Sequence, residues 1–594
     1  MTIIAELAAA YDHLPDMPTA GFANAKIGYV IGLYPNGEPA LPARLLYRPK
    51  TAKKDIPRVL TVPEGSKRTS GIASNFLWDK TAYVLGVGNS KRLEAEHEAF
   101  KSYHFNALKG ITDPGLLALL AFLQSWTPQQ FVEREWPEEM LDQNIVFALE
   151  ADRLSNYYLH DRPAAKALWA DMNNNDQDRK ACLISGEYAP TCRLHPSIKG
   201  VWGAQSSGAS IVSFNQDAFT SYGHIQGENA PVGELTTFKY VTALNAMLSD
   251  PMHRIQIGDA SCVFWAKAPT REQAQDAETL AIGLFDSSQA AQELLEKRAK
   301  EEHSATRDIA EKLQKLLQGQ PLALVAPHLA QDVRFYILGL APNAARLSIR
   351  FWFDNNFSAF IERQQRFFED MRVAPLDRGE ENLPPLWRFL SELAVQGKRE
   401  NVPPNLAGDW YRAILSGARY PLTLLSTTLM RIRTDKHINA KRVAMMKAVL
   451  IRNFGREVPV ALDHDFDNRG YRLGRLFATY EYIQFSALGS QVNATLKDKF
   501  YAAASTRPRS VFAALDRNSA SHLSRLGKDR LKSKRFLDNK IDEIMATMSP
   551  DQDPIPATLP EIDQALFALG YHHQRQEFFK TQQSSDHVDG EPEA

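Results

Sequence analysis

Apolar and polar residues follow two different patterns along this chain. In the first 270 residues, Ala25–Leu33, Thr81–Val87 and Ile145–Glu150 have the composition of short strands. Lys91–Leu108 and Pro114–Gln124 instead repeat apolar residues at helical spacing. Because strands and helices do not alternate regularly, this pattern predicts a mixed α+β region and not a doubly wound parallel sheet.

Helical periodicity dominates the rest of the chain. Arg271–Asp286 and the charged stretch Ala290–Gln318 predict helices, and alternation at Phe335–Leu340 and Arg346–Phe353 predicts one last strand pair around an Ala-Pro-Asn-Ala turn. Further amphipathic helices are predicted at Asp409–Ser416, Tyr420–Arg433, Ala440–Phe454, Arg472–Phe485, Lys497–Ala504, Arg509–Lys528 and Arg535–Met548.

These patterns predict an α+β fold in which a mixed α/β N-terminal region precedes an all-helical C-terminal bundle. We expect four regions: a mixed α+β region at 1–270, a mainly helical region with a short strand pair at 271–400, a helical bundle with a basic face at 401–581, and an acidic disordered tail at 582–594.

Composition places the 594-residue chain among ordinary globular proteins, with 44% hydrophobic and 23% charged residues. No apolar run reaches the roughly 18 residues of a membrane-spanning helix, and the N-terminus lacks the basic segment of a signal peptide. A cytoplasmic protein is therefore expected. The three cysteines suit a reducing compartment, and Cys182 and Cys192 are too widely spaced for a zinc knuckle, so no metal site is predicted.

Charge is sorted along the chain although the formal net charge is only -1. Residues 44–68 hold eight Lys/Arg against two Asp/Glu, residues 471–540 hold fourteen against five, and residues 550–594 hold two against nine. Such sorting indicates a polyanionic partner. A solvated helix face that happens to be basic is the alternative for the C-terminal segment.

The stretch Lys199–Ser213 places glycines around a Gln-Ser-Ser cluster just before an apolar run. Glycine lets a backbone approach a ligand closely, and amide and hydroxyl groups both donate and accept hydrogen bonds. A nucleic-acid groove suits that combination, whereas a hydrolytic site also needs a base beside a nucleophile.

Catalytic motifs are weak in this sequence. Gly86-Val-Gly88 is followed by Lys91 where a dinucleotide fingerprint needs its third glycine. Asp463–Asp467 crowds three carboxylates and one imidazole into five residues, which suits a metal-dependent nuclease, although a solvated interhelical connection is favoured. His572-His573 is interpreted as a helix surface. We therefore predict a protein that is not an enzyme and needs no cofactor.

Several long blocks distributed along the chain carry a resemblance to a known family. The blocks are Lys67–Asp79, Cys182–Pro190, Arg193–Gly200, Gly203–Ser210, Ser213–Gly223, Gln396–Pro404, Tyr471–Phe477 and Leu488–Thr495. In this order they resemble the large subunit of the type I-C CRISPR Cascade.

The resemblance implies a subunit of a crRNA-guided surveillance complex. Such a subunit recognises the protospacer-adjacent motif (PAM) in duplex DNA, helps to open the duplex and stabilise the R-loop, and recruits a separate helicase-nuclease for antiviral interference. The implied partners are crRNA, target DNA, backbone and crRNA 5′-end-binding subunits, and a small helical subunit. The small subunit would start inside this chain, at Met445, at Met446 or at a non-methionine codon.

The resemblance further implies that residues 1–270 are a DNA-recognition region, in which two loops are candidates for binding PAM-containing duplex DNA. The first supplies Lys67, Arg68, Ser70 and Asn75, with the lysine and arginine on phosphates and the short polar groups at base edges. The alternative is that Asn75 caps a turn while Phe76 and Trp78 belong to the core. The second loop supplies Lys199, Gln205, Ser206 and Ser207, acting in a groove or as a wedge at the first base pair.

The basic helical segment is the candidate path for the displaced strand, because Lys and Arg attract phosphates regardless of sequence. Its candidate residues are Arg472, Arg475, Lys497, Arg507, Arg509, Lys532, Lys534 and Arg535. Two other functions stay open: a metal-dependent nuclease built on Asp463–Asp467, and a free-standing DNA-binding protein, for which no helix-turn-helix signature is found.

Overall fold

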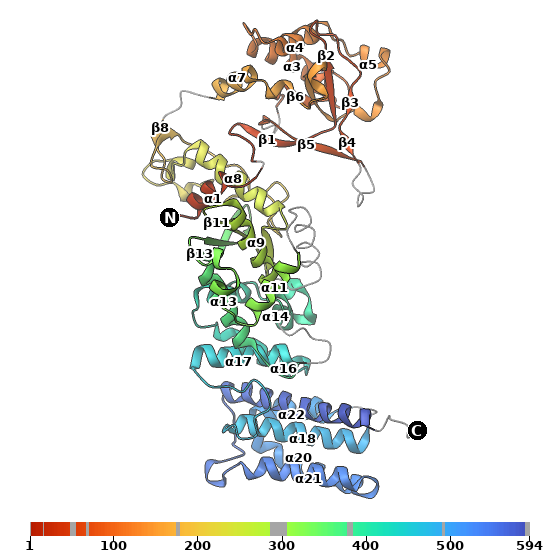
Figure 1. The fold of residues 1–594 in the computed structure, drawn as a ribbon, viewed down its shortest axis with the longest axis vertical. Coiled ribbons are helices and arrows are strands. Elements are labelled where there is room, and N and C mark those ends of the chain that lie inside the picture. The colour runs from red at the N-terminus through yellow and green to blue at the C-terminus, as the bar shows by residue number, and fades with distance from the viewer. Residues whose placement is uncertain are drawn as a thin grey trace. The chain divides into compact units, whose positions relative to one another are not determined.

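The computed structural model describes residues 2–15, 17–47, 55–66, 71–173, 179–285, 306–376, 384–489 and 494–588 (Figure 1). The chain forms two compact units. The N-terminal unit comprises Thr2–Arg193 and Thr220–Tyr240, and the C-terminal unit comprises Leu194–Phe219 and the chain from Val241. Sheets and helices occur together, and the C-terminal part is helical, so the predicted α+β class is confirmed.

A four-stranded sheet is the centre of the N-terminal unit. Its order is β3 (Ala43–Arg44), β2 (Tyr29–Leu33), β7 (Asn144–Leu149) and β6 (Trp78–Lys80). The inner strands β2 and β7 run parallel and the outer pairs are antiparallel. The inner strands are buried on both faces, because helices pack on one face and a cluster that includes Ile27, Val62 and Tyr158 packs on the other.

The remaining strands of this unit form an antiparallel sheet in the order β1 (Phe22–Ile27), β5 (Ile56–Pro63) and β4 (Leu46–Tyr47), and the pair β8 (Arg179–Ala181) and β9 (Tyr188–Pro190). Its helices are α1 (Ile3–Tyr11), α2 (Thr81–Val84), α3 (Leu93–Ala107), α4 (Pro114–Ser125), α5 (Gln130–Glu133), α6 (Glu150–Arg153), α7 (Pro163–Asn173) and the first part of α8 (Glu234–Ser249). The strand predicted at Thr81–Val87 is wrong. Every residue of α2 is buried, and a short apolar run that is buried on all sides does not distinguish helix from strand.

An antiparallel sheet opens the C-terminal unit, in the order β10 (Arg254–Ile257), β11 (Ala260–Lys267), β12 (Arg334–Asn343) and β13 (Arg346–Asn356). The strand pair predicted at Phe335–Leu340 and Arg346–Phe353 is confirmed as part of β12 and β13. The boundary expected at residue 270 lies between β11 and the next helix, and β11 pairs directly with β12.

Helices lie between β11 and β12 in the chain and continue after β13. They are α9 (Arg271–Phe285), α11 (Thr306–Leu317), α12 (Leu322–Val325), α13 (Phe357–Met371), α14 (Leu386–Leu393), α15 (Pro404–Ser416), α16 (Leu422–Asp435) and α17 (Ala440–Phe454). The bounds of α17 agree with the predicted helix. Part of the charged stretch predicted at Ala290–Gln318 lies outside the described residues.

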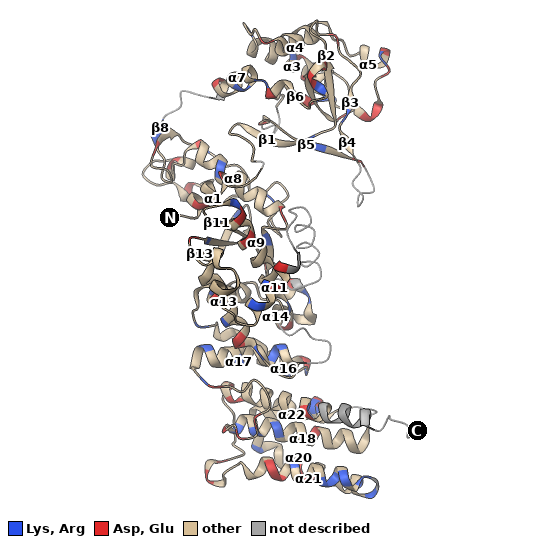
Figure 2. Cartoon of the chain, viewed as in Figure 1, with Lys and Arg blue, Asp and Glu red and all other residues tan. Residues whose placement is uncertain are grey.

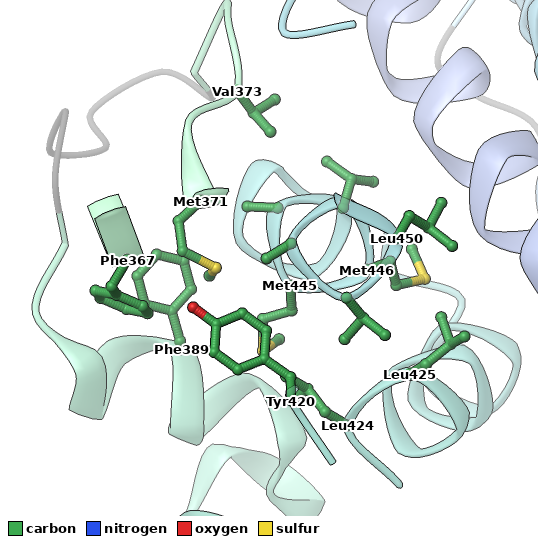
Figure 3. Packing of buried hydrophobic residues seen from close by; sticks show 14 of the residues in the cluster. Phe367, Met371, Val373, Phe389, Tyr420, Leu424, Leu425, Met445, Met446 and Leu450 are labelled. Atoms are coloured by element: carbon green, nitrogen blue, oxygen red, sulfur yellow. The ribbon is translucent and has the colours of Figure 1, made fainter. Parts of the chain in front are cut away.

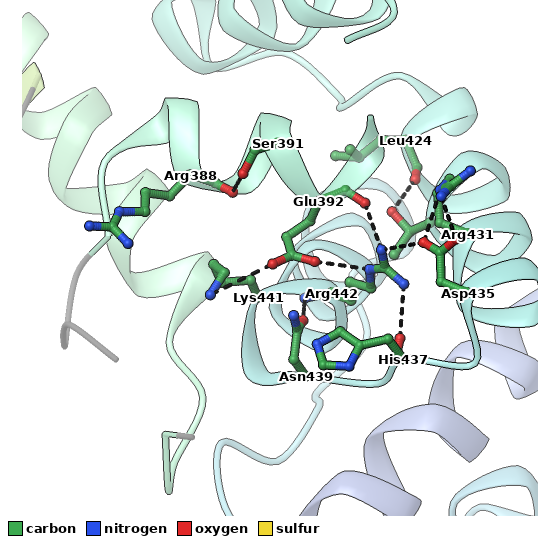
Figure 4. A network of polar contacts seen from close by, with 11 residues as sticks. Arg388, Ser391, Glu392, Leu424, Arg431, Asp435, His437, Asn439, Lys441 and Arg442 are labelled. Carbon is green, nitrogen blue, oxygen red and sulfur yellow. Dashed lines mark hydrogen bonds and ion pairs between the residues drawn. The ribbon is translucent and has the colours of Figure 1, made fainter. Parts of the chain in front are cut away.

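Helix α17 is embedded in this part of the protein. Met445 and Met446 are fully buried, and they lie among apolar side chains of the neighbouring helices, including Phe389 and Leu425 (Figure 3). Polar contacts reinforce the packing, because the Arg442 guanidinium donates to the Asp435 carboxylate at 2.7 Å and to Glu392 at 3.1 Å (Figure 4). These contacts tie α17 to α14 and α16.

The last helices form a bundle that comprises α18 (Arg469–Leu488), α19 (Leu496–Thr506), α20 (Phe512–Asp529), α21 (Leu531–Ala546) and α22 (Glu561–Val588). Glycines bring the backbones of α18 and α22 together. A Cβ at Gly474 would lie 2.0 Å from the Phe567 carbonyl oxygen, and one at Gly570 would lie 2.1 Å from that of Tyr471. Only glycine fits where two helix backbones approach so closely.

Helix α22 has no counterpart among the predicted helices. The interpretation of His572 and His573 as a helix surface is wrong, since both side chains are buried. Nδ1 of His573 lies 2.9 Å from the hydroxyl of Tyr471 on α18, and burial lowers the pKa of His573 to about 3. The helix extends to Val588, while residues 589–594 of the predicted tail lie outside the described part.

Candidate nucleic-acid interface

The stretch Lys199–Ser213, which we call the glycine-rich loop, is closed at its base by an antiparallel bridge between Ile198 and Ala209. The two backbone hydrogen bonds of this bridge are 2.8 and 2.9 Å long. Side chains hold its first half. Asn245 of α8 accepts from the Lys199 amide at 2.8 Å, and Ser261 of β11 accepts from the Trp202 amide at 2.9 Å. The loop therefore has a fixed frame at its base and along its first half.

The tip of this loop is a turn in which the Gly208 amide donates to the Gln205 carbonyl at 2.9 Å. Gly208 has φ +94°, and a Cβ there would lie 2.7 Å from the Ile198 carbonyl oxygen, so glycine is required. The side chains of Gln205, Ser206 and Ser207 are all exposed at this tip, as is Lys199 near the loop's start. All four predicted residues of the second loop are thus available to a ligand.

The first candidate loop is organised differently. Lys67, Arg68 and Ser70 lie outside the described residues. Asn75 is 6% exposed, and its side-chain oxygen accepts from the Ser66 backbone amide at 2.9 Å. The backbone amide of Asn75 donates to the Asp79 carboxylate at 3.0 Å. In this structure the Asn75 side chain joins the two ends of the loop and is not presented to solvent.

Phe76 and Trp78 are core residues, which agrees with the structural alternative for this segment. The Phe76 ring stacks on Trp169 at 5.3 Å between centroids, and Trp78 donates its indole N–H to the Pro63 carbonyl at 2.8 Å. Between them, Leu77 has φ +65° and donates its amide to Nε2 of His104 at 2.9 Å. Burial lowers the pKa of His104 to about 4, so the neutral ring accepts this bond.

Two predicted cations on α18 point into the bundle. Arg475 is 1% exposed, and its guanidinium donates to Gln574 at 3.1 Å and to the carboxylate of Glu543 at 2.9 Å. Arg472 is largely covered and pairs with Asp467 at 2.9 Å. Since Arg475 does not reach the surface, we leave it out of the candidate strand-binding residues.

Other predicted cations lie outside this interior network. Lys497 on α19 is half-buried, and Arg507 is exposed. Arg509 is exposed and pairs with Asp553 at 2.6 Å. A nearby carboxylate lowers the net attraction that Arg509 offers to a phosphate.

Lys532, Lys534 and Arg535 lie on the first turns of α21, where α20 and α21 meet in a helical hairpin. Figure 2 shows blue Lys and Arg positions of the ribbon close together at this end of the hairpin, beside the α21 label. We call the cationic residues of this end the hairpin tip; they are Arg525, Lys528, Arg530, Lys532, Lys534 and Arg535. Five of the six are exposed and Lys534 is half-buried, with its stem crossing Gly527. Among described side chains, none of the six has a carboxylate partner.

The Asp463–Asp467 segment supplies partners for the cations of α18. Asp467 pairs with Arg472, and the carbonyl oxygen of His464 accepts from Arg475 at 3.0 Å. Nδ1 of His464 lies 2.6 Å from Glu543 of α21. Within the described ranges, no group of three or more His, Cys, Asp or Glu side chains is placed to hold a metal ion.

A family comparison places these features in context. The model of the family described as CRISPR-associated protein (Cas_Csd1) matches residues 6–579, nearly the whole chain. The chain belongs to this family. The match confirms the resemblance at the level of a Cascade-type CRISPR-associated protein. No curated protein matches the chain.

The match to the Cas_Csd1 family spans both the glycine-rich loop and the C-terminal bundle.

Arg525, Lys528 and Arg530 of the hairpin tip were not among the residues predicted to bind the displaced strand. Their signal was present, since residues 525–535 contain six Lys/Arg and one Asp. Recognising it required placing the helix-to-helix turn at Arg530, which caps α20 and precedes α21.

No helix within the described ranges is long and apolar enough to cross a membrane.

Proposed function

We propose that this chain is the large subunit of a type I-C crRNA-guided Cascade complex and that it recognises the PAM in target duplex DNA. The observation that carries this proposal is the exposed tip Gln205-Ser206-Ser207 on a loop whose base is fixed by Ile198 and Ala209. A pre-ordered loop pays little ordering entropy when it enters a groove. Membership of the Cas_Csd1 family supplies the guide-directed context.

The same loop is proposed to help open the duplex. Glutamine and serine discriminate poorly between bases on their own, so groove width and strand separation suit this tip better than strict base reading. Lys199 is exposed and lies six residues before Gln205 in the sequence. Its ammonium group would bind a phosphate of the DNA backbone. In the N-terminal unit, Asn75 would act by shaping the loop that carries Lys67, Arg68 and Ser70.

The hairpin tip is proposed to bind the displaced strand and so to stabilise the R-loop. Five of its six cations are exposed, and none of the six has a carboxylate partner among described side chains, unlike Arg472 and Arg475. Phosphates attract such cations without regard to base sequence, and the attraction weakens as salt rises.

A separately made small helical subunit is proposed to correspond to the C-terminal bundle. A start at Met445 or Met446 would begin in the middle of α17 and expose two side chains that are buried among other helices. A non-methionine start between Gly455 and Asn468 would include α18 to α22 complete. We therefore favour a start in that interval.

We further propose that the chain has no catalytic activity of its own and recruits a helicase-nuclease in the cytoplasm. The nuclease alternative would rest on Asp463–Asp467, but Asp467 and His464 are already engaged by Arg472, Arg475 and Glu543. Release of these groups to bind a metal would break contacts inside the bundle.

Two measurements test the proposed function. Co-expression with crRNA and the other complex proteins should yield a complex that contains this chain, and its absence would contradict the assignment. In that complex, Gln205→Ala with Ser206→Ala should weaken binding to duplexes that carry the PAM at least tenfold and affect PAM-less duplexes less. Gln216→Ala, a nearby exposed glutamine, is the matched control. Equal loss on both duplexes would leave only a phosphate-binding role.

A further inference from the structure

A tight turn in the N-terminal unit carries an unusual residue at its tip. The His224 amide donates to the Ser221 carbonyl at 2.9 Å, which closes a four-residue turn. Its central residues Tyr222 and Gly223 have φ angles of +51° and +77°. Positive φ at both central positions is typical of a type I′ β-turn, which the sequence Asn-Gly forms most readily.

Tyrosine is a costly residue at the first central position. A bulky side chain with a Cβ is disfavoured at positive φ, whereas asparagine and glycine tolerate it. Such strain persists only where the surrounding structure enforces it or where function needs it. The turn therefore holds Tyr222 in a conformation that its own preferences oppose.

Contacts within the chain do not compensate for this cost. The side chain of Tyr222 is 99% exposed. The turn itself is firmly held by Asn229, which accepts from the Ser221 amide at 2.9 Å and donates to the carbonyls of His224 at 3.1 Å and Gln226 at 3.0 Å. A rigid support thus presents an aromatic ring that makes almost no contact within the chain.

We propose that Tyr222, with the 60% exposed Ile225, is an anchor that inserts into an apolar pocket on a protein partner. Fixed aromatic side chains make strong anchors because little rotamer entropy is lost on binding, and the phenol hydroxyl still needs one polar partner in the pocket. This inference rests on the proposed function, because the partner is one of the other proteins of the CRISPR complex.

A protein surface fits this turn better than nucleic acid does. Residues 220–227 contain no Lys or Arg, and an exposed isoleucine lies beside the tyrosine. At the base of the turn, Lys180 is paired with Glu228 at 3.2 Å. Binding to nucleic acid draws mainly on phosphate contacts from Lys and Arg. Residues 220–227 supply neither, and the neighbouring Arg193 guanidinium donates to the Gln226 side chain.

The test compares Tyr222→Asn with Tyr222→Phe in the full-length chain. Tyr222→Asn relieves the backbone cost and removes the ring, so the melting temperature of the purified chain should rise or stay unchanged. Recovery of the chain through a tag on another protein of the co-expressed complex should fall at least tenfold. Tyr222→Phe keeps the ring and should retain most of the recovery.

Tyr188→Asn is the matched control, since Tyr188 is a 73% exposed tyrosine on strand β9 of the same unit. It should leave recovery unchanged. Wild-type recovery of Tyr222→Asn would overturn the inference, and so would normal assembly with weakened DNA binding, which would indicate a nucleic-acid contact. A lower melting temperature for Tyr222→Asn would also overturn it, by revealing a structural role. Absence of the wild-type chain from the complex would instead overturn the proposed function, and the anchor with it.

Discussion

The cations of α18 and those of the hairpin tip have the same charge in the sequence but opposite environments in the fold. Arg475 is buried with Gln574 and Glu543, and Arg472 is largely covered and pairs with Asp467. The hairpin tip is mostly exposed and has no carboxylate partner among described side chains. The excess of basic residues at 471–540 therefore combines groups that hold the bundle together with groups that are available to a polyanion.

The largest expected effect is on stability, from Arg475→Ala. Arg475→Ala removes a fully buried side chain, takes a hydrogen-bond donor from the buried Gln574 oxygen and leaves a cavity, which together cost about 3 kcal/mol. Hydrogen exchange of α18 and α22 amides in the full-length chain measures this loss. Lys532→Ala at the hairpin tip is the control and should change stability by less than about 0.5 kcal/mol. Equal effects of the two variants would remove the distinction between the two regions.

A second prediction concerns DNA binding by the hairpin tip. Replacing Lys532, Lys534 and Arg535 together by glutamate should weaken binding of single-stranded DNA and lower the slope of log K against log salt by about 2, if each contacts one phosphate. Stability should be nearly unchanged, because these side chains are mainly exposed. The charge-preserving variant with Lys532→Arg, Lys534→Arg and Arg535→Lys should keep the wild-type slope. An unchanged slope after charge reversal would indicate a solvated face.

The interior network should also depend on pH through Glu543. Burial raises the pKa of this carboxyl, but hydrogen bonds from Lys540 and His464 outweigh that effect and lower it to about 2. A carboxyl has a pKa of about 4.3 in the unfolded chain, so the stabilisation is complete above that pH and is lost as pH falls towards 2. We expect a loss of about 1 kcal/mol, because the pair is partly screened by solvent.

Melting temperatures of wild type and Glu543→Gln between pH 6 and pH 3 check this prediction. The variant should be less stable at pH 6, and its difference from wild type should shrink on acidification. A constant difference between the two proteins across this range would show that the Glu543 charge is not what holds Arg475 and His464.

The smallest expected effect comes from Arg472→Gln. Arg472 is largely covered, but its partner Asp467 is 79% exposed, so the ion pair contributes less than about 1 kcal/mol. The variant should melt slightly below wild type and bind DNA with an unchanged salt slope. A reduced slope would move Arg472 from the structural group to the strand-binding group.

The two loops proposed to read DNA repeat this lesson on a smaller scale. Asn75 and Gln205 are both amides in polar, glycine-containing segments. The buried Asn75 side chain accepts a hydrogen bond from the Ser66 backbone amide, whereas the Gln205 side chain is exposed on a closed turn. In both cases the residue type predicted that the side chain can form hydrogen bonds. The fold decides whether its partner is another group of the chain or an external ligand.

Local patterns determined most of the secondary structure of this protein. Helix α17 and the strand pair β12 and β13 lie where the spacing of apolar residues predicted them. The strand predicted at Thr81–Val87 failed, since a short apolar run has no preferred period when it is buried on all sides. The blocks that resemble a CRISPR-associated family were equally readable from the sequence, and the family match agrees with them.

Only the tertiary structure decided the burial of individual polar residues. His573 and Arg475 belong to helices whose glycines let α18 and α22 approach at backbone distance, and that contact encloses both side chains. The identity of a charged or polar residue does not show whether its side chain contacts water or packs against another helix. Its environment is fixed by packing between segments about 100 residues apart, and no local pattern along the chain records that packing.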